Sequence, residues 1–306
     1  MPARPTPVDA SCVLTPGPWS HRMVSANGAR FHVAEVGEGP LVLLLHGFPE
    51  CWWAWRHLLE PLAAAGWRAA AVDLRGYGAS DKPPRGYDPP TLVGDVAGVV
   101  RALGVERAVV VGHGWGGLLA WTAAVAHPQV VSRVCVVSAA HPRRLRTALL
   151  TDPAQMAASR GALRFQLPVL PERHLAAEGT VAGLLRAWSG PGAFPDREAE
   201  DYYAAALRIP GAAHCALETF RWAVRSVARS DGLRYAHAMR RPVELPVLQV
   251  HGSLDPSVLP TTAAGSGAHV RGPYRWAQLP GTGHFPHEED PGAFGEVLLD
   301  WLARPG

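Results

Sequence analysis

The chain has 306 residues, of which 48% are hydrophobic and 18% charged, and this is enough to bury one large core or a core with an insertion. The formal net charge is only +3 and no block of Lys and Arg is present, so a nucleic-acid partner is not expected. No stretch approaches the roughly 18 apolar residues that a membrane-spanning helix requires, which argues against a membrane protein.

The four cysteines form no C-x-x-C pair and predict neither a zinc site nor a disulfide framework. The segment Met1–Ser20 lacks the basic start and apolar run of a signal peptide. The chain also lacks a cluster of metal ligands and a dinucleotide fingerprint in the right context. We therefore expect a cytoplasmic protein with no metal and no organic cofactor.

Apolar runs alternate with helical segments along the first 140 residues. The expected strands are Phe31–Val36, Leu41–Leu45, Arg68–Asp73, Ala108–Val111 and Val131–Val137. The expected helices are Trp53–Ala65, a helix capped by Thr91 that runs to Leu103, and Leu118–Ala126. This alternation predicts right-handed βαβ units and a mostly parallel sheet.

From about His141 to Arg241 the alternation stops, and the chain looks helical, aromatic and interrupted by proline. Strand signals return at Val247–Val250 and Tyr274–Leu279, and a final helix is expected over Gly292–Leu302. We therefore predict an α/β core made of residues 1–140 and 241–306, with residues 141–240 inserted as a helical lid.

A glycine-rich turn follows the apolar run Ala108–Val111 and reads Gly-His-Gly-Trp-Gly-Gly over residues 112–117. A strand, a tight turn and the start of a helix are the context of the nucleophile elbow, G-x-nucleophile-x-G. The flanking glycines are needed because neighbouring backbones nearly touch in such a turn. The central residue is Gly114, which has no side chain to present.

This setting resembles the epoxide hydrolases and related dehalogenases of the α/β-hydrolase superfamily. There the motif reads G-H-D-W-G-G and the Asp attacks the substrate to form an ester; five of the six positions match, and Gly114 stands at the nucleophile position. The resemblance covers about Met23 to Trp301. It implies the α/β-hydrolase fold, with a mostly parallel eight-stranded sheet, helices on both faces and an inserted helical lid.

The segment His-Gly-Phe-Pro-Glu at residues 46–50 looks like the family's oxyanion segment. In the family, the backbone N–H after the nucleophile and one from this segment stabilise the developing negative charge, and by position these are Trp115 and Phe48. Asp73 begins a turn that is also close to the family's pattern, and we interpret its carboxylate as ordering that turn.

An acid and a histidine follow the last two predicted strands. Asp255 lies in His-Gly-Ser-Leu-Asp-Pro and His284 in Gly-Thr-Gly-His-Phe, and the chain order of nucleophile position, acid and histidine is that of α/β-hydrolases. Asp255 would fix the tautomer of His284 and stabilise its imidazolium form, and His284 would then activate water.

The family supplies two lid tyrosines that protonate the departing alkoxide, and both positions differ here. The first lies four residues before a Phe-Gln-x-Pro segment; that segment begins at Phe165, so the position falls on Gly161. The second belongs to a Tyr-Arg pair that we match to Phe220-Arg221. A shifted alignment would bring Tyr202 or Tyr203 into play instead. We expect the substrate to contact six side chains: His46, Pro49, His113, Phe165, Trp188 and Phe220.

Three functional interpretations remain open. The first is an enzyme that lacks the covalent nucleophile and uses a His–Asp base and an oxyanion hole on an apolar small molecule, by water attack, elimination, isomerisation or cyclisation, in a setting such as secondary metabolism. The second is an epoxide hydrolase inactivated at position 114, by nature or by engineering. The third is a pseudoenzyme that binds a ligand without chemistry. A homodimer is also left open.

Overall fold

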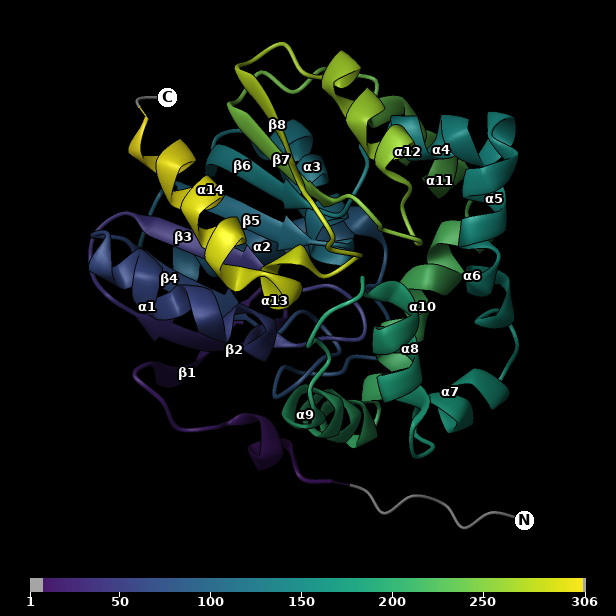
Figure 1. Cartoon of the computed structure of the whole chain (residues 1–306), viewed down its shortest axis with the longest axis horizontal. Helices are drawn as coiled ribbons and strands as arrows, with labels where there is room; N and C mark the ends of the chain where they lie inside the picture. The colour runs from purple at the N-terminus through teal and green to yellow at the C-terminus, as the bar shows by residue number, and fades with distance from the viewer. Residues whose placement is uncertain (1–7, 305–306) are drawn as a thin grey trace.

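The computed structural model describes residues 8–304, so the first seven residues of the predicted non-signal segment lie outside the described residues. One sheet of eight strands forms the centre of the molecule (Figure 1). The strands are β1 Ser20–Ala26, β2 Ala29–Val36, β3 Leu41–Leu45, β4 Arg68–Val72, β5 Ala108–His113, β6 Val131–Val137, β7 Val247–Gly252 and β8 Tyr274–Leu279.

The strand order is β1-β2-β4-β3-β5-β6-β7-β8. The pairs β1/β2 and β2/β4 are antiparallel and all the others are parallel, which confirms the predicted mostly parallel eight-stranded sheet. All residues of β3, β5 and β7 are buried, as expected of strands that are covered on both faces. Because β3, β5, β6 and β7 run parallel, their carboxyl ends meet at one edge of the sheet, where ligand sites of α/β folds form.

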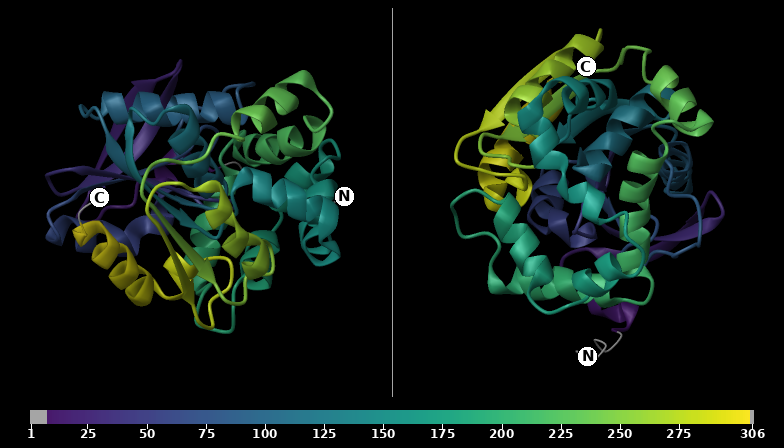
Figure 2. Two further views of the ribbon diagram at one scale, coloured as in Figure 1. Left: turned by 90° about the horizontal axis from the view of Figure 1, so that it is seen from above. Right: turned by 90° about the vertical axis from the view of Figure 1, so that its right-hand side faces the viewer.

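Helices cover both faces of the sheet, as predicted (Figures 1 and 2). In both figures α14 lies on one face and α2 on the opposite one. The helices of this core are α1 Arg56–Ala64, α2 Pro89–Ala102, α3 Trp115–Ala126, α12 Pro260–Ala264, α13 Pro286–Glu289 and α14 Pro291–Ala303, with short 3-10 helices at η1 Ala10–Val13, η2 Trp52–Trp55 and η3 Gly265–His269.

The chain between β6 and β7 contains eight helices and no named strand in the described residues. Its helices are α4 Pro142–Thr151, α5 Pro153–Ser159, α6 Gly161–Arg164, α7 Leu170–Leu175, α8 Thr180–Trp188, α9 Arg197–Arg208, α10 Ala212–Arg225 and α11 Ser230–Ala238. Most of them group beside the edge where the parallel strands end, and the right-hand view of Figure 2 looks onto this group from outside. Among the described residues, no helix combines the length and the apolar character needed to cross a membrane.

Three local predictions differ from the structure. The cap of α2 is Asp88, whose carboxylate accepts a hydrogen bond from the backbone N–H of Thr91, so Thr91 is not the cap. The helix starts earlier because proline is tolerated in the first helical turn. The expected helix from Trp53 begins as the 3-10 helix η2. Strand β1 was not predicted because most of its residues are polar or half-exposed.

Candidate functional site

The tight turn between β5 and α3 requires glycine at two positions. A Cβ on Gly112 would lie 2.1 Å from the carbonyl oxygen of Gly116, and a Cβ on Gly116 would lie 2.2 Å from that of Leu45. Neither position can carry a side chain without moving backbone. Gly114 stands at the centre of this turn with φ 52° and ψ −111°, a conformation that L side chains rarely adopt.

The position of Gly114 has room for a Cβ atom. A Cβ built there would meet only the Cα of Gly47 and the Nε2 of His284, each at 3.6 Å, which is ordinary van der Waals contact. The turn therefore faces the loop after β3 on one side and the loop after β8 on the other. Within the described residues, the backbone N–H groups of Phe48 and Trp115 donate no hydrogen bond to protein, so both predicted oxyanion donors are free.

Asp255 and His284 come together at the ends of β7 and β8. The Nδ1 of His284 lies 2.9 Å from the Oδ2 of Asp255, and the carboxylate also accepts bonds from the backbone N–H groups of Ser257 (2.8 Å) and Val258 (3.0 Å). Burial raises the pKa of Asp255, but His284 and His251 outweigh it and hold this pKa below its usual value. The ionised Asp255 thus fixes Nδ1 of His284 as the donor and directs Nε2 toward Gly114.

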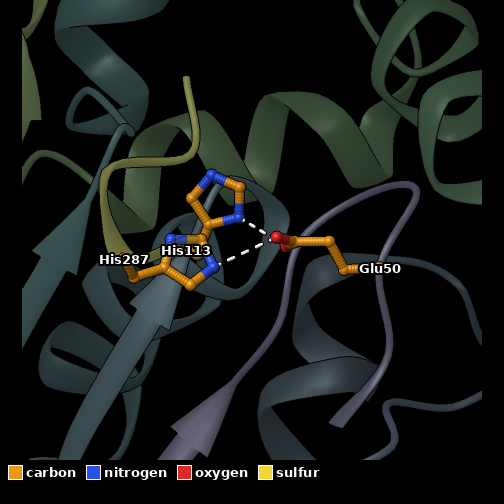
Figure 3. A group of neighbouring side chains, drawn as sticks. All are labelled: Glu50, His113 and His287. Atoms are coloured by element: carbon orange, nitrogen blue, oxygen red, sulfur yellow. Dashed lines mark hydrogen bonds and ion pairs between the residues drawn. The ribbon is translucent and has the colours of Figure 1, made fainter. Parts of the chain in front are cut away.

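A second buried network lies beneath the elbow and links three loops (Figure 3). The carboxylate of Glu50 accepts bonds from Nδ1 of His113 (2.7 Å), from Nε2 of His287 (3.0 Å) and from the backbone N–H of Gly47 (3.0 Å). The Nε2 of His113 lies 2.8 Å from the carbonyl oxygen of His284. Glu50 therefore ties the oxyanion segment, the elbow and the histidine loop together.

The partners of His113 fix its charge. Both of its ring nitrogens face groups that only accept hydrogen bonds, a carboxylate and a carbonyl, so both must carry protons. Burial lowers the pKa of His113, yet the Glu50 carboxylate raises it above its usual value. Burial likewise raises the pKa of Glu50, but the imidazoles of His113 and His287 hold it well below normal. The pair is a buried imidazolium–carboxylate ion pair.

Glu50, His113 and His287 also offer the atoms of a metal-ligand set, all within 4.8 Å of one another. The two nitrogen–oxygen distances of 2.7 and 3.0 Å are those of hydrogen bonds, and protons account for them fully. Burial lowers the pKa of His287 to about 4, so this ring is neutral near pH 7 and donates through Nε2 to Glu50. We interpret the cluster as a hydrogen-bonded support.

Aromatic rings from the core and the inserted helices meet above the elbow. The ring of Phe48 packs against Phe165 (5.8 Å between centroids), Phe220 (5.1 Å) and Trp188 (6.1 Å). Trp115 packs edge-on against Phe220 at 4.9 Å, and Trp188 lies 5.5 Å from the ring of His284. The sequence-predicted contact residues Phe165, Trp188 and Phe220 thus lie together, and they surround the site with hydrocarbon.

The inserted tyrosines of α9 bond elsewhere. The hydroxyl of Tyr202 donates to the carbonyl of Val13 (3.0 Å), and the hydroxyl of Tyr203 donates to the buried carboxylate of Glu288. Gly161 opens α6, and nothing lies within 4 Å of a Cβ built there. Phe220 carries no hydroxyl. None of these four positions directs an acid at His284 in the structure.

His46 and Pro49, two further predicted contact residues, are buried in the loop after β3. The ring of His46 is fully buried, with Nδ1 2.7 Å from the carbonyl of Gly47 and Nε2 accepting a bond from the backbone N–H of Leu74. Both of its nitrogens are therefore used, as are both of His113. Pro49 is buried and joined to Phe48 by a cis peptide bond.

Sequence reasoning missed two residues that support the Asp255–His284 pair. Glu289 accepts hydrogen bonds from the backbone N–H groups of Gly190 (2.8 Å), Gly283 (2.8 Å) and Phe285 (2.9 Å), and so binds this loop to the inserted segment. His251 lies fully buried, with Nε2 3.3 Å from Asp255. An acidic residue five positions after His284 was the available signal for Glu289, whereas His251 had none beyond its place in the strand.

Comparison with known proteins identifies the family to which the chain belongs. Residues 40–291 match the family model described as the alpha/beta hydrolase fold, and the chain belongs to that family. Within it, the chain belongs to the epoxide-hydrolase-like branch: it is 30% identical over 322 residues to epoxide hydrolase A of Mycobacterium tuberculosis, which covers 92% of this chain and 97% of that protein.

Other similar proteins and solved structures are also named as epoxide hydrolases. The chain is 45% identical over 150 residues to epoxide hydrolase 3 of Xenopus tropicalis, although this match spans only 48% of the chain and 41% of that protein. It is also similar to the structure of an epoxide hydrolase from an endophytic Streptomyces, with 31% identity, a TM-score of 0.81 and coverage of 94% and 96% of the two chains. For epoxide hydrolase A of Mycobacterium thermoresistibile the TM-score is 0.78 at 28% identity, with coverage of 93% and 98%.

Proposed function

We propose that this protein is an epoxide-hydrolase-like enzyme that works without a covalent nucleophile. In this proposal Gly114 stands at the nucleophile position, His284 is the general base, Asp255 orients it, and the N–H groups of Phe48 and Trp115 form the oxyanion hole. The single observation that carries the proposal is that Gly114 has no side chain but lies beside the base, with the Nε2 of His284 3.6 Å from a Cβ built there.

The chemistry follows from what the site retains. A neutral Nε2 can remove a proton from water or from a carbon next to a carbonyl, and the imidazolium formed would be stabilised by Asp255, 2.9 Å away. Two free backbone N–H groups can stabilise the oxygen that becomes negative in either reaction. No group at position 114 can form an ester, so water attack, elimination, isomerisation and cyclisation are the reactions that this site supports.

The substrate we propose is an apolar small molecule. Its body would contact the rings of Phe48, Phe165, Trp188 and Phe220, which meet between core and inserted helices. We propose that residues 141–240 act as a lid over residues 1–140 and 241–306, and that His46, Pro49 and His113 support the site from below. The names of the relatives favour epoxides or related small molecules as the first compounds to test.

The absence of a facing acid separates this proposal from an epoxide hydrolase inactivated only at position 114. The rings that surround His284 carry no hydroxyl, and the hydroxyls of Tyr202 and Tyr203 bond to Val13 and Glu288. An acid normally contributes about 10²–10⁴-fold to such a step. Restoring the carboxylate alone is therefore expected to leave covalent hydrolysis incomplete.

The test is a panel of epoxides and aryl ketones incubated with the protein and with His284→Ala, followed by product analysis. We expect conversion by the wild type and at least about a hundredfold slower conversion by the variant. Equal rates would overturn the role of His284. A compound that binds in calorimetry and is recovered unchanged from every reaction would instead favour the ligand-binding pseudoenzyme.

A further inference from the structure

The space at Gly114 has the position of one missing group. Only two atoms, the Cα of Gly47 and the Nε2 of His284, lie within 4 Å of a Cβ built on Gly114. In the related epoxide hydrolases a CH₂–COO⁻ group extends from this backbone position. Acetate is that same group with one more hydrogen and no bond to the chain. The backbone position has room for the first carbon of such a group, beside the Nε2 of His284.

Three polar groups at or beside the elbow make no hydrogen bond among the described residues. The side chain of His284 is 93% buried, since 7% of it is exposed, and its Nε2 is directed at the space. Among the described residues Nε2 makes no hydrogen bond, and neither do the backbone N–H groups of Phe48 and Trp115. A ligand that accepts hydrogen bonds would pair with the two backbone N–H groups, and with Nε2 when His284 carries its second proton.

The electrostatics favour an anion as that ligand. Glu50 is paired with the imidazolium of His113, and Asp255 is paired with His284 once a bound anion stabilises the second proton on that ring. The space also lies at the N-terminus of α3, a helix of 12 residues, where the helix dipole stabilises negative charge. The imidazolium of His284 would form a charge-assisted hydrogen bond to a carboxylate oxygen.

The surrounding aromatic rings indicate the chemical character of the rest of the ligand. Phe48, Trp115, Trp188 and Phe220 enclose the approach, and they would bury an apolar body but pair with no further charge. We propose that the space at Gly114 is a carboxylate-binding slot, and that the protein's own ligand presents a carboxylate there from an aromatic or other apolar body. This inference rests on the proposed arrangement of His284 and the oxyanion donors, but it requires no turnover.

The test measures binding alone, by calorimetry and by NMR shifts of the Trp indole N–H signals, with acetate as the probe. We expect acetate to bind in the millimolar range and its neutral isostere acetamide to bind at least about tenfold more weakly. Gly114→Asp fills the slot with its own carboxylate and should lose acetate binding. Gly183→Ala, in α8 with nothing within 4 Å of the added Cβ, is the matched control and should bind acetate as the wild type does.

A second arm distinguishes a free small anion from a carboxylate carried by a larger ligand. Phenylacetate adds a ring to acetate, and the proposal predicts that it binds at least about tenfold more tightly, whereas benzyl alcohol does not. Equal binding of acetate and phenylacetate would overturn the apolar-body part of the proposal. Equal binding of acetate and acetamide, or unchanged acetate binding in Gly114→Asp, would overturn the slot itself. Binding without turnover would leave the slot standing and would count against the proposed enzyme.

Discussion

Replacement of Gly114 by Asp introduces the carboxylate that the proposed function assigns to this position in related enzymes, and the structure sets the size of the effect on stability. The added Cβ needs no neighbour to move, because its nearest contacts are at 3.6 Å. The backbone at φ 52° and ψ −111° is strained for any residue with a side chain, which costs about 1–3 kcal/mol. We therefore expect Gly114→Asp to fold and to melt a few degrees lower, at about 2–4 °C per kcal/mol.

Comparison with Gly114→Ala separates the effect of backbone strain on stability from the effect of the added carboxylate charge. Both variants share the backbone cost, but the aspartate gains a charge-assisted hydrogen bond from His284 and lies at the start of α3. The aspartate variant should therefore be at least as stable as the alanine variant in thermal melts. An aspartate variant that is clearly less stable than the alanine variant would mean that the site rejects a carboxylate.

Activity on epoxides is the sharper part of this prediction. Gly114→Asp has a nucleophile, a base and oxyanion donors, but no phenol directed at the leaving oxygen. Adding Phe220→Tyr, whose ring already packs 4.9 Å from Trp115, should accelerate multiple-turnover hydrolysis by about 10²–10⁴-fold over Gly114→Asp alone. Epoxide depletion by gas chromatography measures this. If the single variant turns over as fast as the double one, an acid is already present and the reasoning is refuted.

Three other variants test the supporting structure. Gly112→Ala places a Cβ 2.1 Å from the carbonyl oxygen of Gly116, so we expect loss of several degrees or more in melting temperature, and a melt equal to that of Gly183→Ala would contradict the geometry. Glu50→Gln leaves the imidazolium of His113 unpaired and buried, and should lower the unfolding free energy in urea by about 3–5 kcal/mol; a change below about 1 kcal/mol would show that the ion pair is absent. His287→Gln tests a pH effect: unfolded His protonates below its ordinary pKa of 6.5, whereas the folded ring stays neutral down to about 4, so the wild type loses up to about 3 kcal/mol as pH falls through this window. The Gln variant keeps the donor to Glu50 and should lose less; parallel stability curves from pH 6.5 to 4 would refute this assignment.

Local sequence pattern predicted the parts of the fold that depend on short-range physics. A continuous apolar run predicted β3 with its observed bounds, because strands covered on both faces need apolar residues at every position. The glycines of the elbow were predicted from the closeness of backbones in such a turn, and the distances around Gly112 agree. Asp255 and His284, placed by chain order after two strands, lie 2.9 Å apart.

The rest depends on contacts between distant segments. Glu50 meets His287 across 237 positions, and Tyr203 meets Glu288 across 85, so no local pattern marks either pair. The same holds for Tyr202 and Tyr203, since only the folded chain shows their hydroxyls bonded to Val13 and Glu288. The cytoplasmic location stays a prediction, and the homodimer that the sequence left open is tested by light scattering of the purified protein.

The central claim is that His284 acts as a base beside two free oxyanion donors, with no covalent step at Gly114. Deuterium exchange next to the carbonyl of an aryl ketone, followed by proton NMR in D₂O, tests it without knowledge of the natural reaction. The account predicts that the wild-type protein accelerates this exchange, that His284→Ala loses at least about a hundredfold of the acceleration, and that Gly183→Ala retains it. Exchange at the same rate with wild type and His284→Ala would contradict the account.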